Sequence, residues 1–179
     1  MGDNEINMIL HMPYMAAGIT IHEGEARNQI CYQATHHELL VSALAVKMAH
    51  DIDPDNFVSC MLATGNAYPY SCRLEDVMEA ITKDRENYYF TDIQVRGCYP
   101  SYALKELEHL GVKIEFVQDG KQILKDGTVD FVSFSYYSSM VASSDENANG
   151  GAKRNIFASI ENPYLSSSKW GWQIDSLGH

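Results

Sequence analysis

The chain has 179 residues, of which 45% are hydrophobic and 21% charged, the composition of an ordinary globular protein with a substantial core. Its net charge of −11 argues against a nucleic-acid-binding protein, which usually carries a basic surface. The opening MGDNEIN has neither the basic nor the apolar segment of a secretory signal, and no run approaches the ~18 apolar residues of a membrane helix. We therefore expect a cytoplasmic protein that binds neither nucleic acid nor membrane.

The cysteines and histidines do not form a metal motif. The four cysteines are far apart and make no CxxC pair: Cys31, Cys60, Cys72 and Cys98. His36 and His37 are adjacent and so point to different helix faces, and His50 lies too far along the same helix to join them. We expect four free thiols, no metal and no cofactor.

The first feature along the chain is a carboxylate beside an amide, Asn4-Glu5, where a strand is expected to end. This pair suits sugar chemistry, because the acid can protonate a leaving oxygen while the amide holds a neighbouring hydroxyl. A buried barrel strand needs about five or six residues before its catalytic end, and only Met1, Gly2 and Asp3 precede the pair. We therefore expect the chain to open in the middle of a domain.

A long helix is predicted over residues 26–50. Its amphipathic stripe is formed by residues at i, i+3, i+4, i+7 and i+11: His37, Leu40, Val41, Leu44 and Met48. Pro54 ends the helix, because proline biases the preceding residue away from helical conformation. The apolar run that follows predicts a strand over residues 57–64, buried on both faces as in a parallel sheet.

The second half of the chain is predicted to alternate loops, helices and one further strand. Helices are expected over residues 74–89 and 102–110, the second capped by Gly111, with a helical turn at 122–125. Residues 64–71, 92–101 and 143–153 read as loop or irregular chain, and 113–117 as a short extended segment. The second clear strand is residues 129–137. Alternating strands and helices predict an α/β class with a parallel sheet and right-handed crossovers.

Three motifs stand in order along the chain: NEIN at residues 4–7, DFVSFSYY at 130–137 and WGWQID at 170–175. Together with the helix that carries His36-His37 and the segment QVRGCYPSY at 94–102, they resemble glycoside hydrolase family one, most closely its bacterial 6-phospho-β-glucosidases. The resemblance covers essentially the whole chain. It implies a (β/α)₈ barrel whose active site lies at the carboxyl ends of the strands. Residues 1–179 would form a single partial domain, from the tip of strand four to the loop before strand seven.

The resemblance also implies roles for individual residues. Glu5 would be the general acid that later acts as base, and Asn4 would bond the 2-hydroxyl of the sugar. The plainer alternative is that both are solvated residues at a frayed terminus. Gln94, Arg96 and Tyr99 read as structural loop residues without a chemical role.

Four further residues match the family's sugar pocket. Ser135 occupies a position that is often asparagine elsewhere in the family, and serine there resembles the 6-phospho branch. Tyr137 matches a tyrosine that contacts the nucleophile, and it shares one strand face with Phe131, Ser133 and Ser135. Trp170 and Trp172 match a segment beside the sugar. The alternative is that the tyrosine ends an amphipathic strand and the tryptophans are ordinary packing residues.

The chain departs from the family pattern in two places. Gly2-Asp3 stand where the family has Thr-Phe before the Asn-Glu pair. This difference affects the backbone geometry expected at Glu5. The nucleophilic Glu-Asn-Gly motif is missing, since Glu161-Asn162 is followed by Pro163, and the family's phosphate-binding segment is missing too. Retaining hydrolysis needs two carboxyl groups roughly 5–5.5 Å apart.

We therefore expect a fragment of an enzyme that hydrolyses phosphorylated β-glucosides, inactive when isolated. Its unpaired strand edges and apolar faces are expected to be covered by self-association or by the missing remainder of the barrel. One alternative is a non-catalytic carbohydrate-binding or interaction module derived from the barrel. Another is a truncated product with no activity of its own.

Overall fold

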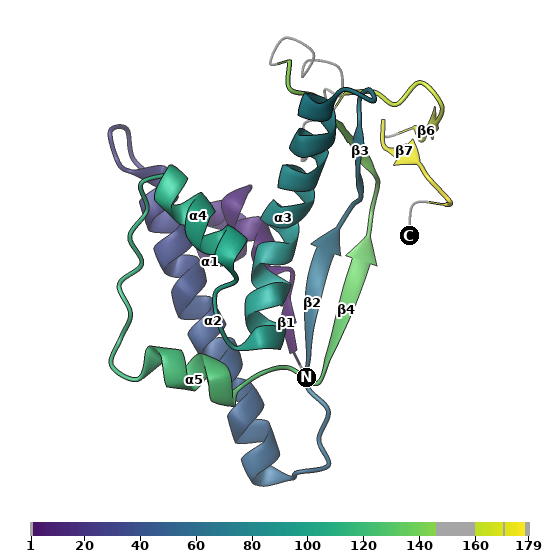
Figure 1. Ribbon diagram of the computed structural model, residues 1–179. Coiled ribbons are helices and arrows are strands. Elements are labelled where there is room, and N and C mark those ends of the chain that lie inside the picture. Colours follow the sequence, from purple (N-terminus) through teal and green to yellow (C-terminus); the bar gives the residue numbers. More distant parts are fainter. Residues whose placement is uncertain (1, 146–159, 170, 178–179) are drawn as a thin grey trace. The chain divides into compact units, whose positions relative to one another are not determined.

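The computed structural model describes residues 2–145, 160–169 and 171–177 (Figure 1). The chain divides into two compact units. Unit 1 comprises Met1–Leu62 and Tyr88–Phe134, and unit 2 comprises Ala63–Asn87 and Ser135–His179. Within the described residues, no helix combines the length and the apolar character needed to cross a membrane.

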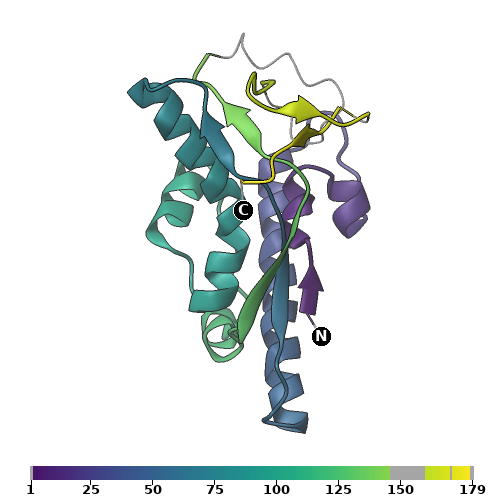
Figure 2. The ribbon, with the colours of Figure 1, turned by 90° about the vertical axis from the view of Figure 1, so that its right-hand side faces the viewer.

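A three-stranded sheet, most of whose residues belong to unit 1, has the strand order β1 (Gly2–Asn4), β2 (Ser59–Thr64) and β4 (Phe131–Tyr136). Strand β1 is parallel to β2, and Figure 2 shows the purple arrow of β1 beside β2. The arrows of β2 and β4 also run in one direction (Figure 1). The two predicted strands are therefore present and parallel, as the α/β pattern requires.

Both strands begin two residues later than predicted, because of the hydrogen bonds that Asp130 makes. Its carboxylate accepts a hydrogen bond from the Val58 N–H at 2.7 Å and lies 3.0 Å from His50 Nε2, while its own N–H donates to the Val58 carbonyl at 2.9 Å. A side-chain oxygen thus takes the place of a strand partner at this end of the ladder. The backbone hydrogen bond from Val58 is the main cause that lowers the pKa of Asp130, and His50 adds to it.

Strand β4 is not buried on either face. Phe131, Val132 and Phe134 are 48%, 43% and 56% exposed, although the sequence reads as a nearly continuous apolar strand. Strand β2 is better covered, with Cys60 1% and Leu62 4% exposed. The expectation of burial on both faces, made for residues 57–64, holds for part of β2. In β4 both faces meet solvent, because alternate residues of a strand point to opposite faces and exposed side chains occur on each.

Helix α2 (Arg27–Ile52) confirms the predicted long helix, but most of the predicted stripe is exposed. Val41, Leu44 and Met48 are 63%, 46% and 64% exposed, whereas Leu40 is 6% exposed. Leu40 lies on a buried side whose other members are outside the predicted stripe: Cys31, Tyr32, Thr35, His36, Leu39, Ser42, Ala43 and Val46. Apolar residues occur on two sides of α2, and its contacts with the 3-10 helix η1 (Ile6–Leu10) and with α5 (Gly120–Asp126) select one of them.

Helix α3 (Leu74–Arg96) runs farther than predicted, so the prediction of irregular chain from residue 92 is wrong up to Arg96. Phe90 and Ile93 are 1% and 0% exposed, and their burial sustains the helix. Helix α4 (Ser101–His109) and helix α5 confirm the other two helical predictions. The short helix α1 (Pro13–Ala17) was not predicted.

The extended segment at residues 113–117 forms no strand; two glutamine side chains of α2 take the place of a partner strand. The Gln29 amide donates to the Lys113 carbonyl and accepts from its N–H, both at 2.9 Å. Gln33, one turn later, makes the same pair of bonds with Glu115, at 3.1 and 2.8 Å. The backbone polar groups of the segment are therefore satisfied by a helix surface.

The core of unit 1 lies among α2, α3, α4 and the segments that join them. Its fully buried members include Ile9, Leu39, Phe90, Ile93 and Ala103. Tyr89 packs edge-on against Tyr32, Phe90 and Tyr99 at ring-centroid distances of 5.5, 5.3 and 5.9 Å.

Unit 2 contains two small sheets. Strand β3 (Ala67–Pro69) is parallel to β5 (Met140–Ala142), and β6 (Ser166–Ser167) is antiparallel to β7 (Gln173–Ile174). The predicted loop at residues 64–71 is thus partly a strand. Gly65 permits this pairing, because a Cβ there would overlap the Ser138 carbonyl oxygen. Most of the predicted polar loop at 143–153 lies outside the described residues.

Candidate active site

Glu5 lies in unit 1 directly after β1, where the chain turns into η1. Its φ of 53° and ψ of 38° are in the left-handed region, which residues other than glycine rarely adopt. The Glu5 N–H donates to the Met61 carbonyl at 2.8 Å, and the Met8 N–H donates to the Glu5 carbonyl at 2.9 Å. Such a conformation costs ~1–3 kcal/mol, so these bonds and the strand pairing must outweigh it. A half-buried carboxyl side chain is thereby held at the carboxyl end of a parallel strand.

Asn4 and Asn7 flank this carboxylate in the sequence but differ in setting. Asn4 is the last residue of β1 and pairs with Met61 of β2. Asn7 lies in η1 and is only 1% exposed. Because buried amides are as a rule hydrogen-bonded within the protein, Asn7 belongs to the support of the turn.

The three residues predicted to have no chemical role lie at the end of α3 or in the loop after it. Gln94 and Arg96 are helical and not loop residues, which corrects the prediction: Gln94 donates to Ser42 Oγ at 3.0 Å, and Arg96 donates to Asp92 at 3.1 Å. Tyr99 does lie in a loop, with its hydroxyl 2.8 Å from Nδ1 of His36. The contacts of Gln94 and Tyr99 join α3 and the loop after it to α2, whereas the Arg96–Asp92 pair lies within α3.

His36 and His37 point to different sides of α2, as their adjacency predicts. His36 is 0% exposed, and His37 is exposed with its Nε2 3.0 Å from the Gln33 amide nitrogen. Burial lowers the pKa of His36, and the neighbouring His37 lowers it further. Within the described ranges, no three His, Cys, Asp or Glu side chains gather as the ligands of a metal ion would.

Two aromatic residues from distant parts of the sequence meet in unit 2. The rings of Tyr137 and Trp172 pack edge to face, with centroids 5.8 Å apart and planes at 90°. Tyr137 follows the end of β4 and remains 44% exposed, while Trp172 is half-buried. A partly exposed aromatic pair of this kind offers apolar faces and a phenol hydroxyl at one surface.

Hydrogen bonds fix the segment that carries Trp172. The Ser168 N–H donates to the Trp172 carbonyl at 2.7 Å, which closes the turn between β6 and β7. The Gln173 amide makes two bonds with the backbone of Asn162, at 2.9 and 3.0 Å. The Tyr68 hydroxyl of β3 donates to Asp175 at 2.9 Å, and this bond is the first cause that raises the pKa of Tyr68. Sequence reasoning missed Tyr68, although Asp175 lies in the WGWQID motif.

Ser135 lies near the end of β4 and is half-buried, two residues before Tyr137 and therefore on the same side of the strand. Trp170 lies outside the described residues. Of the residues proposed from sequence, unit 1 carries Asn4 and Glu5, and unit 2 brings Tyr137 and Trp172 into contact.

A buried carboxylate that the sequence did not reveal organises the chain after β5. Asp76, in the first turn of α3, is 2% exposed and accepts hydrogen bonds from the Ser71 and Ser143 hydroxyls and from Ser144. The bond from Ser71 and the backbone N–H of Ser144 lower the pKa of Asp76 to about 2. The aspartate therefore fastens the segment that follows β5 to the start of α3.

Comparison with protein families and curated proteins gives a consistent picture. The family model described as glycosyl hydrolase family 1 matches residues 1–179. The 6-phospho-beta-glucosidase AscB of Escherichia coli is 53% identical over 175 residues, which are 98% of this chain and 37% of that protein. The aryl-phospho-beta-D-glucosidase BglH of Bacillus subtilis and the phospho-cellobiase of Klebsiella oxytoca are each 43% identical over the same shares. The chain thus spans a little over a third of the length of these relatives.

Solved structures show the same fold. The family 1 β-glucosidase from Thermotoga maritima superposes with a TM-score of 0.70 at 20% identity, over 96% of this chain and 36% of that one. The β-glucosidase from Exiguobacterium marinum gives a TM-score of 0.68 at 18% identity, over 94% and 37%. The fold is α/β, part of a (β/α)₈ TIM barrel with parallel strands and flanking helices, as the sequence predicted.

Proposed function

The chain belongs to glycosyl hydrolase family 1, and from this membership we propose that it supplies the acid/base part of a retaining 6-phospho-β-glucosidase. The observation that carries the proposal is the position of Glu5. Glu5 directly follows a parallel strand, and the hydrogen bond from its N–H to the Met61 carbonyl holds its backbone there. Catalytic groups of barrel enzymes occupy the carboxyl ends of the strands.

In the proposed reaction the Glu5 carboxyl donates its proton to the glycosidic oxygen as the bond to the anomeric carbon breaks. A second carboxylate attacks that carbon and forms a glycosyl-enzyme ester. Glu5, now a carboxylate, then takes a proton from water, and the water oxygen displaces the ester. Asn4 hydrogen-bonds the 2-hydroxyl of the sugar.

The aromatic residues of unit 2 are proposed as sugar contacts. Tyr137 and Trp172 hold each other edge to face, and Trp172 is fixed by the turn from Ser168. An ordered, partly exposed indole suits an apolar pyranose face. We assign Trp170 and Ser135 to the same sugar.

The second carboxylate is assigned to a part of the enzyme outside these 179 residues, because the sequence holds no Glu-Asn-Gly motif. A substrate such as cellobiose 6-phosphate follows from the kinship with phospho-β-glucosidases, of which the phospho-cellobiase of Klebsiella oxytoca is one. The phosphate-binding residues belong to that outside part too.

A chimaera tests the proposal. The matching 175 residues of the Escherichia coli enzyme AscB would be replaced by this chain, which is 53% identical to them. We expect the chimaera to hydrolyse 4-nitrophenyl 6-phospho-β-glucoside. Glu5→Gln should lower kcat/KM for cellobiose 6-phosphate, whose alkoxide leaving group needs the proton, by about 10²–10⁴-fold, the usual effect of a general acid. Glu115→Gln, at an exposed position of unit 1, should leave it unchanged.

A folded chimaera that fails to act on the substrate, or one in which Glu5→Gln retains full activity, would refute the assignment. A circular-dichroism melt of each variant separates loss of chemistry from loss of fold.

The isolated chain is expected to show only background turnover, because general acid catalysis alone is far short of the ~10⁶-fold minimum of an enzyme. Turnover by the isolated chain that Glu5→Gln removes would reveal a second carboxylate within the 179 residues. Binding of a 6-phospho-β-glucoside without turnover would be expected of the non-catalytic module considered above.

A further inference from the structure

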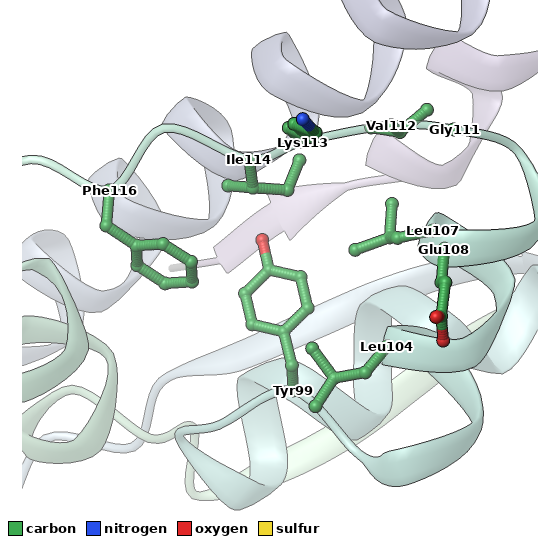
Figure 3. A pocket seen from close by; sticks show the side chains of 9 residues that line it. All are labelled: Tyr99, Leu104, Leu107, Glu108, Gly111, Val112, Lys113, Ile114 and Phe116. Atoms are coloured by element: carbon green, nitrogen blue, oxygen red, sulfur yellow. The ribbon is translucent and has the colours of Figure 1, made fainter.

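A cavity of about 520 Å³ lies in unit 1, between the end of α3, the loop that follows it and helix α5. Its apolar lining is provided by Tyr99, Leu104, Phe116 and Leu124. Tyr99, Leu104 and Phe116 also line a second cavity of about 360 Å³, shown in Figure 3, where the Tyr99 ring stands between Leu107 and Phe116 with its hydroxyl toward Ile114. The larger cavity is therefore walled by two aromatic side chains and has the size of a small-ligand site.

Gly97 makes this cavity possible. Its φ is +66°, and a Cβ there would lie 2.6 Å from the Cα of Lys125 and 2.8 Å from the Leu124 carbonyl oxygen. Only glycine tolerates both the backbone conformation and this approach. The end of α3 consequently lies against α5, and Cys98 comes to line the same cavity as the α5 lysines.

The charged side chains that line the cavity are cationic, and Gln122 adds a neutral amide. Lys121 and Lys125 are four residues apart in α5 and so lie on one helix face. The Lys121 ammonium is 5.3 Å from the centroid of the Phe116 ring. Arg96 also lines the cavity but is bonded to Asp92 at 3.1 Å. In the part of the chain that the structure describes, neither lysine enters an ion pair, although the protein carries a net charge of −11.

We propose that this cationic cavity binds a small aromatic anion, of the class of an aryl phosphate. The ring would lie against Tyr99 and Phe116, where aromatic contacts are favourable. The anionic group would take charge-assisted hydrogen bonds from Lys121 and Lys125. None of the lining residues belongs to the proposed catalytic or sugar-binding set, so the two sites are tested separately.

Two exposed cysteines provide a direct test in the 179-residue chain. Cys98 lines the cationic cavity, and Cys72 is exposed in unit 2, while Cys31 and Cys60 are buried. Alkylation by iodoacetamide would be followed at each cysteine by peptide mass spectrometry, with and without 1-naphthyl phosphate. At a probe concentration about ten times its Kd, mass action leaves about one site in eleven empty, so Cys98 should react roughly tenfold more slowly. Cys72 should react at an unchanged rate.

Lysine variants, and probes that carry only the anionic group or only the aromatic ring, complete the experiment. Lys121→Gln with Lys125→Gln should weaken the protection of Cys98 by about tenfold or more in Kd, since charged hydrogen bonds are lost. Lys105→Gln, an exposed lysine of α4 outside the lining, should not. Cys31 and Cys60 are buried, so their remaining unlabelled shows that each variant is folded. Equal protection of Cys72, full protection by inorganic phosphate or by 1-naphthol alone, or unchanged affinity in the double variant would each overturn the proposal.

Discussion

The imidazole Nδ1 of His36 and the hydroxyl of Tyr99 lie 2.8 Å apart and form a hydrogen bond between residues 63 positions apart in the sequence. The ring of Phe116 packs edge-on against the imidazole at 4.6 Å. Among the described residues, the second nitrogen of His36 has no hydrogen-bond partner. One hydrogen bond therefore satisfies one ring nitrogen of a fully buried histidine and joins α2 to the loop after α3.

Tyr99→Phe is expected to destabilise unit 1. The substitution removes the hydroxyl and leaves a buried imidazole without this bond, which costs ~1–3 kcal/mol. Urea denaturation followed by circular dichroism measures the change. Tyr14→Phe is the matched control, because Tyr14 is 70% exposed and its change should stay within ~0.5 kcal/mol. Equal stabilities of the two variants would contradict the importance of the bond.

The stability of the chain should fall as the pH drops below about 6.5, the ordinary pKa of histidine. Burial lowers the pKa of His36 in the folded state, so between the folded and ordinary values the unfolded chain binds more protons. Stability then rises with pH through this window and is lost toward lower pH. Urea midpoints from pH 5 to pH 8 should flatten in His36→Gln and keep their slope in His22→Gln, an exposed site.

Gly127→Ala should cost more than Gly111→Ala. A Cβ at Gly127 would overlap the backbone carbonyl oxygen of Ala43 in α2, and overpacking of this kind costs about 3 kcal/mol. Gly111 has φ +67° with nothing within 4 Å of the added Cβ, so only the left-handed backbone is penalised, by about 1 kcal/mol. Thermal melts of the two variants side by side make the comparison. The reverse order would mean that α5 and α2 can separate freely.

Asp76→Asn should remove an acid-sensitive contact within unit 2. The pKa of Asp76 is lowered to about 2, so its contribution is complete above the ordinary value of about 4 and is lost as the pH falls toward 2. Hydrogen exchange of the Ser144 amide, which bonds Asp76 at 2.9 Å, reports the contact. Exchange should accelerate in the variant already at neutral pH. Asp55→Asn, at an exposed position of unit 1, should leave this amide protected.

The 179-residue chain, studied alone, is expected to self-associate. Strand β4 ends the strand order of its sheet and exposes Phe131 and Phe134, at 48% and 56%, on opposite faces. Exposed apolar strand faces and edges are usually covered, and a stable contact would bury at least ~1,000 Å². Sedimentation at micromolar concentration measures the assembly, and Phe134→Glu should shift it toward monomer. A monodisperse monomer of the unmodified chain would count against this expectation.

The sequence alone predicted the order of the helices and strands and the family to which the chain belongs. Proline and glycine signals and apolar runs predicted α2, α4, α5 and the two longer strands, because these signals act over a few neighbouring residues. The motifs around Glu5, Tyr137 and Trp172 indicated the family that the comparisons show. Each motif is contiguous, so no knowledge of packing was needed to read it.

Tertiary structure alone decided which side of each element is buried and how distant residues meet. Helix α2 buries Leu39 and Val46 and exposes Val41, because apolar residues lie on two of its sides and its packing partners choose one. Buried Phe90 and Ile93 extend α3, and Gln29 and Gln33 replace a partner strand. The left-handed backbone of Glu5 and the contact of Tyr137 with Trp172 likewise depend on groups far away in the chain. A one-dimensional pattern records local preference, whereas these features result from competition among surfaces that exist only once the chain has folded.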